Sequence, residues 1–106
     1  MTTELKDKIV FITGASSGFG ADASRLFARN GSIVILAARR RDRLNTLVDE
    51  ICADGGQAMA LSLDMAKQSQ IDLSVRTVLK TYGRIDILLN NAGLGRLDWL
   101  GRAWHP

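Results

Sequence analysis

The sequence has 106 residues, of which 46% are hydrophobic and 24% are charged, and its formal net charge is +3. This length allows one small domain, and the longest apolar runs have the length of strands, which is too short for a membrane span. The single cysteine, Cys52, excludes an internal disulfide, and the N-terminus lacks the apolar stretch of a secretory signal, so we expect a cytoplasmic protein.

The first predicted element is a buried strand at residues 9–12, where four apolar residues follow one another. It leads into three glycines, Gly14, Gly18 and Gly20, and then into a helical pattern. Strand, glycine turn and helix N-terminus together form the geometry that binds a dinucleotide pyrophosphate. We expect Gly14 to allow the sharp turn, Gly18 to let bare backbone approach the phosphates, and Gly20 to let the helix pack closely on the strand.

The first helix is predicted from apolar residues at helical spacing, which we expect to be buried: Phe19, Ala23, Leu26 and Phe27. It ends at Gly31, and a second strand follows at residues 32–38. This strand is apolar throughout instead of alternating, which is typical of a parallel sheet covered on both faces.

A second helix is predicted at residues 42–53, and its apolar stripe includes Cys52, which we therefore expect to be a packing residue. A third strand follows at 58–63, a third helix at 67–82 and a fourth strand at 85–89. This alternation predicts an α/β fold, a Rossmann-type parallel sheet with βαβαβαβ connectivity and the strand order 3-2-1-4.

The residues after the second strand bear on the choice of dinucleotide. In this architecture an acid at that strand end favours NAD, whereas an arginine accommodates the 2′-phosphate of NADP. The chain reads AARR at 37–40, with no carboxylate before Asp42. We therefore predict that NADP(H) is preferred over NAD(H), with Arg39 as the main phosphate-binding residue and Arg40 and the Ser16 hydroxyl as helpers. The alternative interpretation is a solvated basic turn before a helix.

Residues 13–20, which read TGASSGFG, and residues 90–93, which read NNAG, resemble two signature segments of the short-chain dehydrogenase/reductase (SDR) family. The resemblance covers about residues 5–98. It implies that Asp64, after the third strand, bonds the adenine amino group and that the Met65 backbone N–H bonds a ring nitrogen. The alternative for Asp64 is a side chain that caps the following turn.

The resemblance also implies that NNAG ties the fourth strand to the glycine turn and touches the adenosine ribose. The predicted cofactor-binding residues are therefore Gly14, Ser16, Ser17, Gly18, Phe19, Gly20, Arg39, Arg40, Asp64, Met65, Asn90, Asn91, Ala92 and Gly93. Residues 1–106 are expected to form one partial NAD(P)-binding Rossmann domain with an irregular tail at 99–106, and no metal site is predicted.

In the family, catalysis uses a Ser and a Tyr-x-x-x-Lys helix that lie beyond NNAG; the Tyr donates a proton to the substrate carbonyl while the nicotinamide delivers hydride. The one tyrosine here, Tyr82, precedes NNAG and is followed four residues later by Asp86. We therefore expect the NADP(H)-binding part of an oxidoreductase for a carbonyl or alcohol substrate, with no catalytic residue in this chain. A gene fragment, a frameshifted product or a truncation would have this form.

Two other functions remain open from the sequence. The same half-fold could be a non-catalytic dinucleotide-binding or redox-sensing module, and the basic residues at 39–43 could bind nucleic acid. We expect no nucleic-acid partner, because the other basic residues alternate with acids, and no membrane partner, because the apolar runs are too short to span a bilayer. We do expect self-association through the fourth strand, which is apolar and predicted to lie at a sheet edge.

Overall fold

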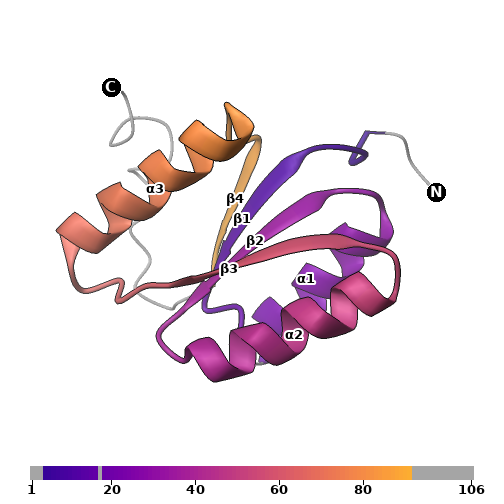
Figure 1. Ribbon diagram of the computed structural model, residues 1–106, viewed down its shortest axis with the longest axis horizontal. Coiled ribbons are helices and arrows are strands. Elements are labelled where there is room, and N and C mark those ends of the chain that lie inside the picture. The colour runs from indigo at the N-terminus through magenta and orange to yellow at the C-terminus, as the bar shows by residue number, and fades with distance from the viewer. Residues whose placement is uncertain (1–3, 17, 92–106) are drawn as a thin grey trace.

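The structure is a computed structural model that describes residues 4–16 and 18–91. Strands and helices alternate along the chain, as predicted: β1 (Ile9–Thr13), α1 (Gly18–Arg29), β2 (Ile33–Ala38), α2 (Arg41–Ala53), β3 (Gln57–Ser62), α3 (Gln68–Tyr82) and β4 (Ile87–Asn90). The four strands form a parallel sheet in the order β3-β2-β1-β4 (Figure 1). The predicted Rossmann-type α/β fold and its strand order are therefore confirmed.

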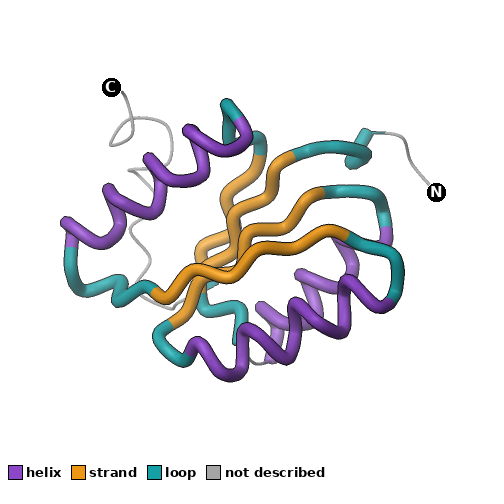
Figure 2. Tube along the Cα trace, in the orientation of Figure 1, coloured by secondary structure: helices purple, strands orange, loops and turns teal. Residues whose placement is uncertain are grey.

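Helices cover both faces of this sheet: α1 and α2 lie on one face, and α3 lies on the other (Figure 2). Successive residues of β1 point to opposite faces. Val10 and Ile12 pack in the core beneath α1 and α2, whereas Ile9 and Phe11 pack in the core beneath α3. All five residues of β1 are buried, which explains why its sequence is apolar without alternation. None of the helices in the described ranges combines the length and apolar content that a bilayer span requires.

β4 lies at an edge of the sheet, as predicted. Within the described residues it pairs with β1 alone, beginning with Ile87 opposite Val10, and all four of its residues are half-buried. It begins two residues later than the sequence pattern predicts, because a side chain and not a backbone carbonyl accepts the Ile9 N–H beside its start. The Asp86 carboxylate there accepts a hydrogen bond from the Ile9 N–H at 2.8 Å.

The prediction that Phe19 and Leu26 belong to a buried stripe of α1 is wrong, because they are 66% and 60% exposed. The residues of α1 that are buried are all small: Gly20, Ala21, Ala23, Ser24 and Ala28. Small side chains let the helix approach the sheet closely, so α1 turns its small residues inward and carries Phe19 and Leu26 toward solvent. The prediction holds for Ala23, which is buried, and for Phe27, which is half-buried and packs against the core.

The prediction that Cys52 is a packing residue is also wrong, because Cys52 is exposed. The buried residues of α2 are Leu44, Leu47 and Ile51. Cys52 is one residue past Ile51, which places it about 100° further round the helix, beyond the contact with the sheet.

Candidate functional site

The predicted site residues lie on segments that leave the same edge of the sheet, here called the carboxyl edge. The strands are parallel, and the register places Thr13 of β1 beside Ala37 of β2 and Asn90 of β4. β3 ends beside the end of β2 in the same way. The carboxyl edge of an open parallel sheet is where such folds bind their ligands.

The glycine turn after β1 has the backbone conformation that its sequence predicts. Gly14 has φ of 62° and Gly18 has φ of 56°, both in the left-handed region that favours glycine. The turn is held to β2 by a hydrogen bond from the Ala15 N–H to the Ala37 carbonyl at 3.2 Å, and Ser16 is half-buried within it. A Cβ added at Gly18 would meet no atom within 4 Å, so the backbone there faces open space.

Gly20 permits a closer contact than any other residue would allow. A Cβ at this position would lie 2.3 Å from the Gly14 carbonyl oxygen and 2.7 Å from the Asn91 Nδ2. Gly20 was predicted to allow close packing on the strand, and the close contacts in the structure are instead with the glycine turn and Asn91. The N-terminus of α1 is thereby pressed against the turn.

A hydrogen-bond network centred on Thr13 ties β4 to the glycine turn. The Thr13 hydroxyl donates to Asn90 Oδ1 at 2.9 Å and accepts from the Asn91 N–H at 3.0 Å. The Asn91 side-chain amide donates to the Gly14 carbonyl at 3.2 Å. The resemblance implied such a tie but did not assign Thr13 to the site. The signal was present, since Thr13 is the polar residue that directly follows an apolar strand and precedes the first glycine.

The two arginines after β2 differ in their partners. Arg40 contacts Asp42 through two hydrogen bonds, from Nε at 3.3 Å and from Nη2 at 3.1 Å. This contact raises the pKa of the Arg40 guanidinium and lowers the pKa of the Asp42 carboxyl. Arg39 is exposed and forms no ion pair with any residue that the structure describes, while its carbonyl accepts a 3.4 Å hydrogen bond from the Ser62 hydroxyl. The Arg39 side chain is thus available to a ligand, and that of Arg40 is engaged.

Asp64 takes part in the turn between β3 and α3. Its Oδ1 accepts the Ala66 N–H at 2.9 Å, so the turn-capping alternative raised by the sequence is what the structure shows. Gln70, which the sequence did not single out, accepts the Asp64 N–H through Oε1 at 2.8 Å. Met65 is half-buried and packs against the core beneath α3. Contact of Asp64 and Met65 with adenine stays a prediction.

The remaining predicted site residues are placed in part. Phe19 is exposed in the first turn of α1, beside the glycine turn. Ser17, Ala92 and Gly93 lie outside the described residues. In the described ranges, no group of three or more His, Cys, Asp or Glu residues could hold a metal ion.

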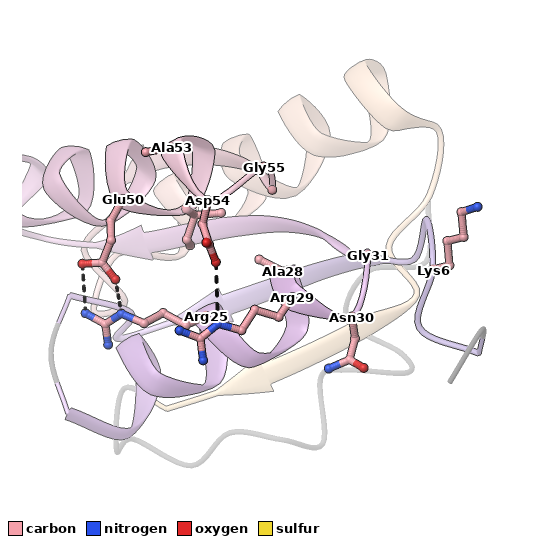
Figure 3. Close-up of a pocket in the computed structure, with 12 residues that line it drawn as sticks. Lys6, Arg25, Ala28, Arg29, Asn30, Gly31, Glu50, Ala53, Asp54 and Gly55 are labelled. Atoms are coloured by element: carbon pink, nitrogen blue, oxygen red, sulfur yellow. Dashed lines mark hydrogen bonds and ion pairs between the residues drawn. The ribbon is translucent and has the colours of Figure 1, made fainter. Parts of the chain in front are cut away.

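An open groove of about 790 Å³ lies away from the carboxyl edge, where α1 and α2 end (Figure 3). Two ion pairs cross it, one between Arg25 and Glu50 and the other between Arg29 and Asp54 at 3.7 Å. Its wall includes Gly31, which precedes β2, so the groove is at the amino end of the sheet. The paired charges join the two helices and are separate from the predicted cofactor site.

Comparison with known proteins gives consistent matches over most of the chain. The model of a family described as short chain dehydrogenase matches residues 8–102. A fatty acyl-CoA reductase of Mycobacterium tuberculosis is 46% identical over 90 residues, which are 85% of this chain and 31% of the relative. A metagenomic short-chain oxidoreductase solved in complex with NADP has a TM-score of 0.82 at 35% identity, over 87% of this chain and 42% of that one. L-Sorbose reductase from Gluconobacter frateurii, solved with NADPH and L-sorbose, has a TM-score of 0.83 at 34% identity, over 90% and 36%.

The chain spans about a third of the length of the curated relatives that it matches. The family match contains the glycine turn, the arginines after β2 and the two asparagines that bond to Thr13 and Gly14. The family consists of oxidoreductases that bind a nicotinamide dinucleotide. With the match extending over residues 8–102 and the parallel sheet in the order β3-β2-β1-β4, the chain belongs to the short-chain dehydrogenase family.

Proposed function

We propose that this chain binds NADP(H) at the carboxyl edge and forms the cofactor-binding part of an oxidoreductase. The observation that carries the proposal is the glycine turn, in which Gly14 and Gly18 have positive φ and the backbone at Gly18 faces open space. Helix α1 begins at this turn, with Gly18 as its first residue. Its free N–H groups and the positive end of its dipole would hold the pyrophosphate.

The preference for NADP(H) over NAD(H) is attributed to Arg39. Its side chain is exposed and unpaired within the described residues, and it follows the end of β2, where the adenosine ribose would lie. The nearest acid along the chain, Asp42, is already paired with Arg40. The charge-assisted contact of Arg39 with a 2′-phosphate would favour NADPH by about tenfold or more.

The reaction of the whole protein is proposed from the family and from its relatives. NADPH would supply hydride to a carbonyl substrate, or NADP⁺ would accept it from an alcohol. Two relatives are named as reductases, a fatty acyl-CoA reductase and an L-sorbose reductase, and the second was solved with NADPH and L-sorbose, which supports this proposal. The 106 residues contain no Tyr-x-x-x-Lys, so we propose that they bind the dinucleotide without turning it over. We also propose a cytoplasmic location, because the one cysteine is a free thiol and the cytoplasm keeps thiols reduced.

Calorimetric titration of NADPH into the chain and into Gly18→Ala tests the pyrophosphate site. The added methyl would meet no protein atom but would occupy the space that the phosphates need, so binding should weaken by about tenfold or more. Gly55→Ala is the matched control, because Gly55 also has positive φ, of 89°, and open space, and lies at the far groove. Equal NADPH affinity in the two variants would overturn the proposal.

A further inference from the structure

The basic segment before α2 carries its own counter-charge. Arg40 is the N-cap residue of α2 and has extended backbone, with φ of −92° and ψ of 95°. Asp42 lies in the first turn of the same helix, where the helix dipole stabilises an anion. Both nitrogens that Arg40 uses, Nε and Nη2, are hydrogen-bonded to the two carboxylate oxygens of Asp42.

This contact occupies the Nε/Nη2 edge of Arg40, which is one of the two edges through which its guanidinium could bind a phosphate. A guanidinium binds a phosphate or a carboxylate through the same two parallel N–H groups, so Asp42 and a 2′-phosphate compete for one side of Arg40. Arg39 has no such competitor in the part of the chain that the structure describes. The adjacent arginines are therefore unequal, although the sequence presents them as a pair.

We propose that Asp42 weakens 2′-phosphate recognition by engaging the Nε/Nη2 edge of Arg40. The inference rests on the proposed NADP(H) site and goes further, because it assigns a specificity-determining role to an acid outside the predicted site. The side chains of Arg40 and Asp42 are 61% and 67% exposed, so water competes with their contact and its effect on binding should be small.

The test uses two ligands that differ by the 2′-phosphate alone: adenosine 2′,5′-bisphosphate and adenosine 5′-monophosphate. Asp42→Asn should raise the affinity for the bisphosphate by about twofold to fivefold, the range expected for release from an exposed ion pair, and should leave the monophosphate unchanged. Asp49→Asn is the matched control, because it removes the same charge from an exposed position of α2. It should change neither affinity.

A second background separates release of Arg40 from simple repulsion by Asp42. In Arg40→Gln, adding Asp42→Asn should no longer raise bisphosphate affinity. An increase that persists in this background, an equal increase in Asp49→Asn, or no increase in Asp42→Asn itself would overturn the inference.

The affinities of the wild type and Arg39→Ala for the same two ligands separate failure of the NADP(H) site from failure of the role given to Asp42. If the wild type prefers the bisphosphate and Arg39→Ala abolishes that preference, the NADP(H) site stands and an unchanged Asp42→Asn refutes this inference alone. If the wild type binds neither ligand, or binds both equally, the NADP(H) assignment fails and this inference fails with it.

Discussion

At the scale of single residues, the Thr13 hydroxyl joins two strands and a turn. It is 1% exposed, and it both donates to Asn90 and accepts from the Asn91 N–H. We predict that Thr13→Val, which keeps the shape and removes the hydroxyl, lowers the free energy of unfolding by about 1–3 kcal/mol, because the Asn91 N–H loses its acceptor. Thr13→Ser keeps the hydroxyl and should retain more of that stability, as measured by urea denaturation. An unchanged stability in Thr13→Val, or a loss in Thr13→Ser as large as in Thr13→Val, would contradict the role given to the hydroxyl.

Gly20 and Gly18 lie two residues apart and should respond differently to the same change. A Cβ at Gly20 would lie 2.3 Å from the Gly14 carbonyl oxygen, so Gly20→Ala must displace the turn or the helix. We predict a loss of about 1–3 kcal/mol of stability from this overpacking. Gly18→Ala meets no atom within 4 Å and should cost about 1 kcal/mol, from its positive φ. Thermal unfolding of the two variants compares the losses, and a larger loss in Gly18→Ala would contradict the packing described for Gly20.

At the scale of elements, β4 is fixed to β1 at both of its ends. At the carboxyl end Thr13 bonds to Asn90, and at the amino end the Asp86 carboxylate accepts the Ile9 N–H. Arg84 contacts the same carboxylate at 2.9 Å and donates to the carbonyl of Asp7, two residues before β1. A four-residue strand thus relies on side chains as well as on its ladder.

The amino-end contact should make the stability of the sheet depend on pH. Burial alone would raise the pKa of Asp86, but the hydrogen bonds from the Ile9 N–H and Arg84 outweigh it and hold the pKa below its ordinary value of 3.8. Because the pKa of Asp86 is lower in the folded state than in the unfolded state, the ionised carboxylate stabilises the fold at any pH above the unfolded-state pKa. This stabilisation is lost as the pH falls through the folded-state pKa. We predict that Asp86→Asn flattens the acid limb of the stability curve below about pH 4. An unchanged acid limb in urea denaturation would contradict this role.

The strands and their order were predictable, and the orientation of α1 was not. Continuous apolar runs such as residues 9–12 indicate a strand buried on both faces, and they require no knowledge of the partner. The buried side of α1 is decided by side-chain size, since Ala21 and Ser24 fit against the sheet where Phe19 would not. Hydropathy alone favours large apolar residues, so the sequence pattern was right at Ala23 and Phe27 and wrong at Phe19 and Leu26.

In the candidate site, too, the backbone features were predictable from the sequence and the side-chain contacts were not. Gly14 and Gly18 were predictable because few other residues adopt their backbone conformation. The contacts of Asp42 with Arg40 and of Gln70 with Asp64 depend on side-chain conformations at the starts of α2 and α3. The sequence places these residues near each other but does not determine which pairs form.

At the scale of the whole molecule, apolar side chains are exposed on both faces, and the edge strand β4 is apolar at residues 87–89. Phe19 and Leu26 of α1 and Leu73 of α3 are each at least 60% exposed, and within the described residues β4 has no strand on its outer side. An apolar edge strand is a template for pairing with another chain. The proposed association of this chain with itself therefore has two competing origins, the edge and the helix faces.

We predict concentration-dependent association through β4, detected by sedimentation velocity and by hydrogen exchange. The amides of β4 should exchange more slowly as the concentration rises, because pairing protects an open edge. The double variant Leu26→Lys/Leu73→Lys removes apolar side chains from both helix faces and should still associate. If the double variant is monomeric, the association belongs to the helix faces and not to β4. If the wild type stays monomeric at high concentration, the predicted association does not occur.

The central claim is that the carboxyl edge binds NADP(H) and recognises its 2′-phosphate through Arg39. Calorimetric titration of NADPH and NADH tests this claim most directly, with the wild type, Arg39→Ala and the control Arg43→Ala, which removes an exposed arginine within α2. The account predicts a wild-type preference for NADPH of about tenfold or more, lost in Arg39→Ala and kept in Arg43→Ala. Equal affinity for both dinucleotides in the wild type, or a preference that survives in Arg39→Ala, would contradict it.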